Sequence, residues 1–148
     1  LPKEAERKVL QCSGEKNFHG AAEICRKQGV PEKMIRRLRK LITTYGPIDE
    51  VVGDLDQLAV NNTMRRAVGE LKVLVSALKA QKLEKNVRFD FSAVNDMGYY
   101  NGVIFQGFIK GIVRPILAGG RYDNLMEVMG KESAGAIGFP FPWIPWKS

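Results

Sequence analysis

Two cysteines and one histidine are the only thiol and imidazole groups in this chain of 148 residues. Cys12 and Cys25 lie in or near segments with helical character, and His19 has no acidic or cysteine partner beside it. A structural zinc site takes about four such ligands at close spacing, so the sequence predicts no metal site and His19 is expected at the surface or in packing. So few thiols favour a reducing, cytoplasmic setting over a disulfide framework.

Long hydrophobic runs are also missing, and the longest fall well short of the roughly 20 residues that a membrane helix requires. The chain starts at Leu1, and residues 1–13 lack both the apolar core of a signal peptide and the pattern of a transit peptide. We therefore expect a piece of a longer protein, with residues 1–148 forming one compact fragment around a single core.

Acidic residues are scarce at the N-terminal end. The net charge is +7, and residues 1–40 hold eleven Lys or Arg against five Asp or Glu, a local excess of 11 − 5 = +6. An RNA-binding surface usually interleaves such cations with aromatic side chains. That pattern is missing here, which favours a solvated basic surface over RNA contact.

Helical periodicity dominates residues 14–85. The spacing predicts a helix over 18–28 that ends at Gly29, and another that has Pro31 in its first turn and ends at 45–47. Residues 48–59 predict short helical turns interrupted at Gly53, and 63–85 predict the longest helix, capped from 61–63. Residues 1–13 stay unassigned.

Alternation replaces this periodicity after residue 86. Val87, Phe89 and Phe91 share one side of a predicted strand, and further strands are expected over 99–110, 112–118 and 136–141, with a short helix over 123–129. Helices followed by a mostly antiparallel sheet predict an α+β fold in which the two pack together. Three prolines between 140 and 146 predict an irregular tail.

Residues 89–123 have the composition expected of a ligand site. Asn101-Gly102 favours either a tight chain reversal or a simple bend within one strand. Gly119 and Gly120 allow close approach of backbone in a predicted loop, and Arg121 supplies a planar fork of donors for a carboxylate or phosphate. This stretch is our candidate pocket wall.

Two motifs in that stretch resemble those of class II histidyl-tRNA synthetases. That family carries R-G-L-D-Y-Y-T-G-x-x-F-E and, after a strand, A-x-G-G-R-Y-D-x-L. The matching residues are Asn95-Asp96-Met97-Gly98-Tyr99-Tyr100-Asn101-Gly102-Val103-Ile104-Phe105-Gln106 and Ala118-Gly119-Gly120-Arg121-Tyr122-Asp123-Asn124-Leu125. The resemblance extends from about residue 17 to residue 139 and implies part of a class II synthetase core.

Three departures from the family motif concern catalysis. The position of the family's catalytic arginine is Asn95, that of its aspartate is Gly98, and that of its glutamate is Gln106. Asparagine cannot bring positive charge to a developing phosphate transition state. The family's ATP-binding arginine motif lies upstream of this chain, so we expect no catalytic residue, no bound cofactor and no aminoacyl adenylate.

This combination resembles the synthetase paralogues that serve as regulatory subunits of ATP phosphoribosyltransferase in histidine biosynthesis. The resemblance implies a catalytic-subunit partner, assembly with it into a hetero-oligomer, self-association, and histidine as a ligand. It places Tyr100 and Tyr122 at the histidine. Tyr99, Gly119, Gly120, Arg121 and Asp123 would support the pocket.

Two other interpretations stay open. One is a fragment of a divergent histidyl-tRNA synthetase, an enzyme that would need ATP and tRNA contacts from an upstream half. The other is a degenerate synthetase-like binding domain with an unrelated partner.

Overall fold

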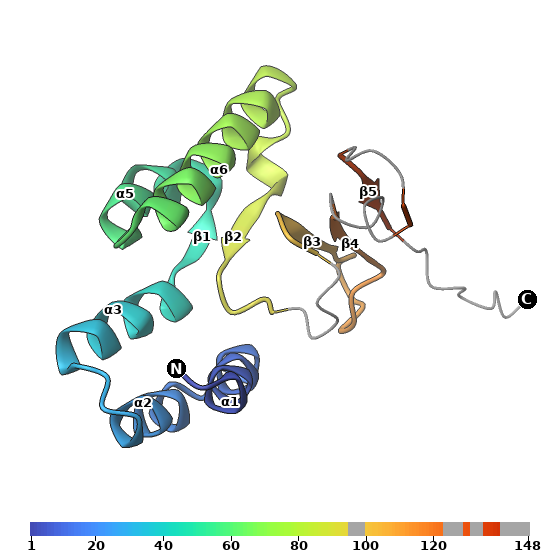
Figure 1. Ribbon diagram of the computed structural model, residues 1–148. Helices are drawn as coiled ribbons and strands as arrows, with labels where there is room; N and C mark the ends of the chain where they lie inside the picture. Colours follow the sequence, from blue (N-terminus) through green and yellow to red (C-terminus); the bar gives the residue numbers. More distant parts are fainter. Residues whose placement is uncertain (95–99, 123–128, 131–134, 140–148) are drawn as a thin grey trace, which may run out of the picture. The chain divides into compact units, whose positions relative to one another are not determined.

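The computed structural model describes residues 1–94, 100–122, 129–130 and 135–139 (Figure 1). The chain divides into two compact units, residues 1–94 and 95–148. The first is mainly helical and carries a two-stranded sheet, and the second carries a three-stranded antiparallel sheet. Helices together with antiparallel strands confirm the predicted α+β class.

The unassigned N-terminal stretch is a helix, α1 (Lys3–Gly14). Ala5, Val9 and Ser13 are its buried residues and recur at every fourth position, so they share one face. Ser13 satisfies its buried hydroxyl by donating to the Val9 carbonyl oxygen at 2.8 Å. The periodicity was hidden in the sequence because only two of these three side chains are apolar.

The next two helices follow the prediction closely. In α2 (Phe18–Lys27), Asn17 caps the N-terminus by accepting a hydrogen bond from the Gly20 amide at 2.9 Å. Gly29 follows the helix at φ 74°, the left-handed conformation that glycine adopts without strain. Pro31 is the N-cap of α3 (Glu32–Thr43), one residue outside the first turn where it was expected.

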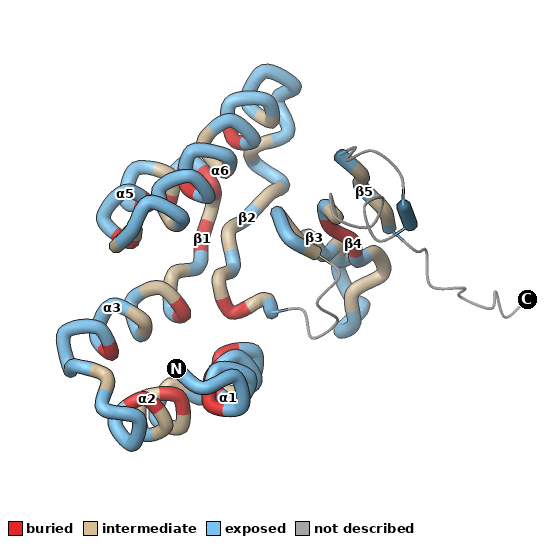
Figure 2. The backbone as a smooth tube through the Cα atoms, in the orientation of Figure 1, coloured by how far each residue is buried: buried red, intermediate tan, exposed pale blue. Residues whose placement is uncertain are grey.

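These three helices share one cluster of buried side chains. Val9 of α1, Ala21 and Cys25 of α2, and Ile35 of α3 form it, and burial raises the pKa of the Cys25 thiol. Figure 2 shows buried positions on the sides where α1 and α2 face each other.

Residues 45–47 end α3 as predicted, but they form a strand, β1 (Tyr45–Pro47). It pairs antiparallel with β2 (Arg88–Asp90), which confirms the strand predicted after residue 86. Between them lie α4 (Ile48–Val51), η1 (Val52–Asp54), α5 (Leu55–Leu58), α6 (Asn62–Ala80) and η2 (Glu84–Asn86). The break in helix at Gly53 and the Asn61 cap of α6 are therefore confirmed.

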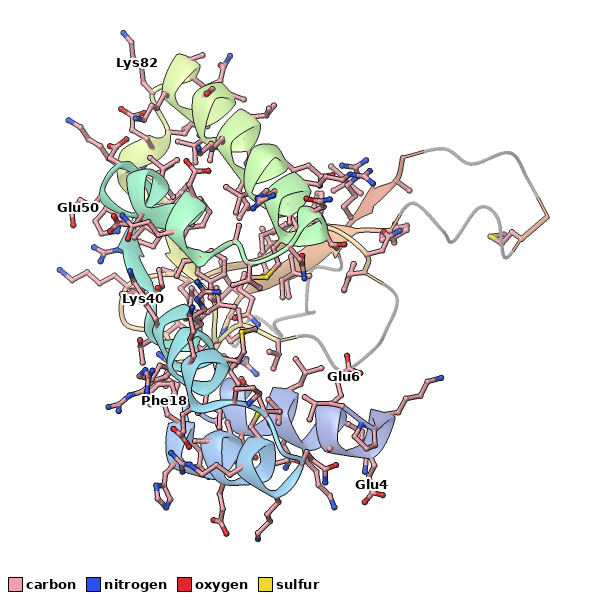
Figure 3. The ribbon with its side chains drawn as sticks, turned by 60° about the vertical axis from the view of Figure 1, so that its left-hand side comes forward. Glu4, Glu6, Phe18, Lys40, Glu50 and Lys82 are labelled. Carbon is pink, nitrogen blue, oxygen red and sulfur yellow. The ribbon has the colours of Figure 1, made fainter. Side chains whose placement is uncertain are left out.

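The predicted end of the longest helix at residue 85 is wrong, because α6 stops at Ala80. Lys82 adopts φ 59°, its amide donates to the Lys79 carbonyl at 2.9 Å, and the Leu83 amide donates to the Leu78 carbonyl at 2.9 Å. These two bonds form a Schellman motif, which normally has glycine where Lys82 stands. The exposed Lys40, Glu50 and Lys82 side chains extend outward from this unit (Figure 3).

A second cluster of buried side chains lies beneath α6. Val51, Leu55, Leu58 and Val68 form it, and Phe89 and Phe91 pack against it. The two phenylalanine rings stack at a centroid distance of 5.7 Å, in agreement with the prediction that they share one side of the chain, although Phe91 lies just after β2.

The second unit has the strand order β3 (Ile104–Gly107), β4 (Leu117–Arg121) and β5 (Ile137–Gly138). Ile104 pairs with Gly120, and Gly120 in turn pairs with Gly138. The strands expected over 99–110 and 136–141 are shorter in the described residues, and the one expected over 112–118 lies further along the chain. Gly119, Gly120 and Arg121 therefore belong to a strand, which corrects the predicted loop. The helix expected over 123–129 and the tail fall almost wholly outside the described residues.

Candidate functional site

Tyr100 and Tyr122, the two predicted ligand-binding residues, meet on the sheet of the second unit. Tyr122 follows β4 directly, and Tyr100 stands four residues before β3. Their ring centroids are 6.0 Å apart, the ring planes are tilted by 48°, and both residues are half-buried. This distance is that of two aromatic side chains in mutual contact.

Glycines form the floor under this tyrosine pair. A Cβ atom at Gly120 would lie 2.6 Å from Cδ1 of Tyr100, and a Cβ atom at Gly138 would overlap the Tyr122 hydroxyl. Carbon atoms pack at about 3.5–4.0 Å, so neither position has room for a side chain. Because Gly120 and Gly138 are register partners, the two tyrosines lie side by side on one face.

The other face of this sheet is also aromatic. Phe105 pairs with Gly119 in the register, and a Cβ atom at Gly119 would lie 2.7 Å from both Phe105 Cζ and Phe139 Cβ. The two phenylalanine rings contact each other edge to face at 6.4 Å. Successive residues of a strand point to opposite faces. Gly119 therefore leaves room for the phenylalanine pair on one face, and Gly120 leaves room for the tyrosine pair on the other.

A bend, and not a chain reversal, brings Tyr100 onto the sheet. Neither Asn101 nor Gly102 has positive φ, and both lie beside the end of β4. The Arg121 amide donates to the Val103 carbonyl at 3.0 Å, and the Asn101 amide donates to the Arg121 carbonyl at 3.1 Å. Three residues therefore stand opposite one, as in a β-bulge. Of the two alternatives for Asn101-Gly102, the bend is confirmed.

The side chain of Arg121 lies close to Gly102. A Cβ atom at Gly102 would lie 3.2 Å from both Cβ and Cδ of Arg121, a tight approach. The actual connection between β3 and β4 runs through residues 108–116, with Gly111 at φ 90°. The aliphatic part of the Arg121 side chain thus packs against the bulge at Gly102.

The structure brings together Tyr100, Gly119, Gly120, Arg121 and Tyr122 of the predicted site. Tyr99 and Asp123 lie outside the described residues, as do Asn95 and Gly98. Gln106, which replaces the family's glutamate, is exposed on β3 and shares the face of Ile104 by strand alternation.

Sequence reasoning missed Gly138, which lies beneath Tyr122, and the contact between Phe105 and Phe139 on the opposite face of the sheet. A glycine within a short strand usually marks a close approach of other groups, so Gly138 carried the detectable signal. The tyrosine rings are too close for a ligand ring to insert between them, since a stacked ring needs about 3.5 Å on each side. The hydroxyls of the two tyrosines can donate and accept hydrogen bonds to a polar ligand that lies beside the pair.

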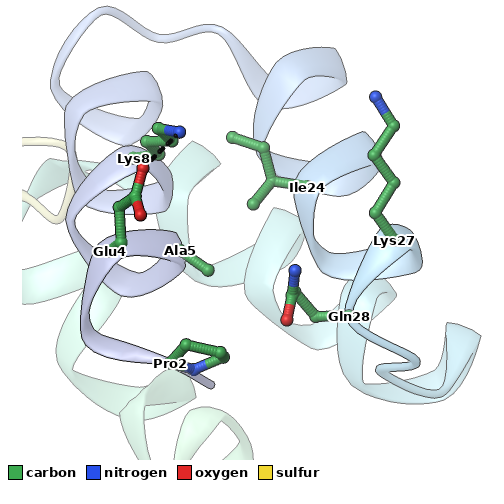
Figure 4. A pocket seen from close by; sticks show the side chains of 7 residues that line it. All are labelled: Pro2, Glu4, Ala5, Lys8, Ile24, Lys27 and Gln28. Carbon is green, nitrogen blue, oxygen red and sulfur yellow. Dashed lines mark hydrogen bonds and ion pairs between the residues drawn. The ribbon is translucent and has the colours of Figure 1, made fainter.

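A hollow of about 430 Å³ between α1 and α2 is lined in part by Glu4, Lys8, Lys27 and Gln28 (Figure 4). Lys27 is paired with Glu23 at 2.9 Å. Lys8 and Glu4 on its rim pair at 2.8 Å, and this hydrogen bond holds the pKa of Glu4 below its usual value. The charges on that rim are already paired, so we place the candidate site at the tyrosines. Among the described residues, no group of His, Cys, Asp and Glu could hold a metal ion, and no helix is long and apolar enough to cross a membrane.

The family comparison agrees with the resemblance in the motifs. The chain matches the histidyl-tRNA synthetase family over residues 1–142. Curated relatives are named ATP phosphoribosyltransferase regulatory subunit. The protein of Oceanobacillus iheyensis is 32% identical over 126 residues, which cover 85% of this chain and 31% of the relative. That of Syntrophotalea carbinolica is 31% identical over 141 residues, which cover 95% of this chain and 32% of the relative.

Solved structures show the same fold. An ATP phosphoribosyltransferase regulatory subunit/histidyl-tRNA synthetase from Bacillus halodurans matches with a TM-score of 0.79 and 27% identity, covering 90% of this chain and 35% of its own. A histidine–tRNA ligase subunit from Alicyclobacillus acidocaldarius matches with a TM-score of 0.70 and 27% identity, covering 93% and 44%. The chain spans about a third of the length of the curated relatives it matches.

Proposed function

Since the chain belongs to the histidyl-tRNA synthetase family, we propose that it is part of a non-catalytic regulatory subunit of ATP phosphoribosyltransferase. Relatives at about 31% identity carry that name, which favours this function over aminoacylation. The protein binds histidine and reports it to a separate catalytic subunit in the cytoplasm, and it associates with itself as well as with that partner.

One observation supports the proposal most strongly: the two tyrosines are in contact above the glycines of the sheet, whereas the position of the family's catalytic arginine holds another residue. Tyr100 and Tyr122 lie on a glycine floor that holds both rings in contact. Residue 95, the position of the family's catalytic arginine, is asparagine. A site that recognises an amino acid without activating it is what a sensor requires.

Histidine suits this site chemically. Its imidazole offers one donor and one acceptor, which phenol hydroxyls can satisfy at the ring edges. We assign recognition to Tyr100 and Tyr122, and support of the pocket to Tyr99, Gly119, Gly120, Arg121 and Asp123.

The assembly experiment mixes the protein with a short-form ATP phosphoribosyltransferase catalytic subunit. Association, restored synthesis of phosphoribosyl-ATP and inhibition by added histidine are the expected results. Absence of both association and restored activity would overturn the proposal.

The binding experiment measures histidine affinity by calorimetry. Tyr122→Phe removes one hydroxyl and keeps the ring, so the affinity should fall by about threefold to tenfold, the value of one hydrogen bond. Unchanged affinity would remove Tyr122 from the site.

An alternative is a divergent histidyl-tRNA synthetase, which the ligase subunit of Alicyclobacillus acidocaldarius supports as a structural neighbour. It predicts histidine-dependent exchange of pyrophosphate into ATP. The regulatory proposal predicts none, because Asn95 carries no positive charge.

A further inference from the structure

A groove of about 350 Å³ between α2 and α3 is lined by none of the residues of the tyrosine site. Its floor is apolar. Ala21, Ile35 and Ile42 are buried there, and Phe18, Ala22 and Leu38 remain half-buried. Apolar side chains left partly open along a helix–helix groove are a surface that another helix can cover.

Cations line the rim of this groove. Arg26, Arg36 and Arg39 stand against one carboxylate, Glu32, so the rim carries a net charge of 3 − 1 = +2. Glu32 is already paired, since it accepts from Arg26 Nε at 2.5 Å and from Arg26 Nη2 at 3.4 Å. Within the part of the chain that the structure describes, neither Arg36 nor Arg39 forms an ion pair.

The length of the groove sets the size of its occupant. Glu32 and Ile42 stand near its two ends along α3, ten residues apart. At a rise of 1.5 Å per residue, this corresponds to about 15 Å, or about ten residues of a partner helix. Arg36 and Arg39 are three residues apart, so carboxylates at a similar helical spacing on the partner could reach both.

We propose that this groove binds an acidic amphipathic helix of the catalytic subunit. The apolar stripe of that helix covers the floor, and its carboxylates pair with Arg36 and Arg39. A nucleic acid would meet the arginines with its phosphates but would leave the apolar floor uncovered, because its backbone is charged throughout. This inference rests on the proposed function for the identity of the partner.

The experiment titrates the protein with a short-form catalytic subunit. Arg36→Glu combined with Arg39→Glu should weaken association by at least about tenfold, since two attractive contacts become repulsive. Arg65→Glu combined with Arg66→Glu is the matched control, because both arginines are exposed on α6 away from the groove, and it should change the affinity by less than about twofold. Ala22→Gln keeps the charge but fills the floor, so it should also weaken binding, which a general electrostatic attraction would not explain.

Three outcomes would overturn the inference, and they separate it from the proposed function. If the wild type binds and the groove variants bind equally well, the groove is not the interface while the regulatory function stands. If the wild type does not bind the catalytic subunit at all, both the groove inference and the proposed regulatory function are wrong. A short RNA duplex is the second probe. If Arg36→Glu with Arg39→Glu abolishes RNA binding and leaves binding of the catalytic subunit unchanged, the groove is an RNA-binding surface.

Discussion

Replacing Gly138 with alanine puts a methyl group where the Tyr122 hydroxyl lies. The same methyl carbon would stand 2.7 Å from Cε1 and Cζ of Tyr122, against an ordinary carbon–carbon contact of about 3.5–4.0 Å. The ring must therefore move by roughly 1 Å to reach an ordinary contact distance. Overpacking of this kind costs about 1–3 kcal/mol, and we expect about 2 kcal/mol for Gly138→Ala.

Tyr122→Phe tests whether the hydroxyl is the cause. It removes the atom that overlaps the methyl group and leaves the two ring carbons, so Gly138→Ala should cost only about 1 kcal/mol in the phenylalanine background. The difference is a coupling free energy of about 1 kcal/mol, within the range found for residues in contact.

The coupling free energy can be measured from the hydrogen-exchange rate of the Tyr122 backbone amide, which belongs to one of the two substituted residues. That amide donates to the Ala136 carbonyl at 2.9 Å, so its exchange reports the separation of β4 from the segment that leads into β5. Gly138→Ala should speed exchange by about 30-fold with tyrosine at 122, and by about fivefold with phenylalanine there, since about 1.4 kcal/mol is tenfold. Additivity of the two substitutions within about 0.4 kcal/mol would refute the packing argument.

Three further predictions concern the first unit, each measured by urea unfolding followed with far-UV circular dichroism. Gly69→Ala should stabilise the unit by about 1 kcal/mol, because a Cβ atom there meets nothing within 4 Å inside a helix; a destabilisation would contradict the open space. Lys82→Gly should stabilise it by up to about 1 kcal/mol, because φ 59° strains a side chain but not glycine, and no change would mean that Lys82 is unstrained. The hydrogen bond from Arg26 lowers the pKa of Glu32, so that pair stabilises the fold above the ordinary carboxyl pKa of about 4.3 and the benefit disappears as the pH falls through the lowered value. Glu32→Gln should therefore be less stable than wild type at neutral pH and equally stable in acid, and a gap that persists in acid would contradict this assignment.

Sequence reasoning located helices better than it located their ends. Residues 61–63 marked the start of α6, where Asn61 caps the helix by accepting a hydrogen bond from the Met64 amide, whereas the Asn17 cap of α2 was not predicted. Gly29 marked one end because glycine is the usual residue in the left-handed conformation. Lys82 adopts the same conformation without any compositional signal, so the end of α6 was placed five residues too late.

The glycine pair of β4 shows why the site was only partly predictable. Glycine weakens an isolated strand, so a loop was the expected structure at Gly119 and Gly120. The strand forms because aromatic rings take the space that side chains would fill, and those rings come from residues distant in sequence. The sequence around Gly119 and Gly120 alone cannot predict which distant rings will pack against them. The meeting of Tyr100 with Tyr122 was foreseen from the family motifs alone.

The glycine floor has a consequence for how variation in this region can be interpreted. At positions 119, 120 and 138, any larger side chain collides with a ring or with backbone, so these glycines would be retained whether or not a ligand is bound. The hydroxyl groups of Tyr100 and Tyr122 are different, because phenylalanine can replace either tyrosine at little steric cost. Selection for ligand recognition would therefore be seen in the choice between tyrosine and phenylalanine at these two positions, and selection for folding in the glycines beneath them.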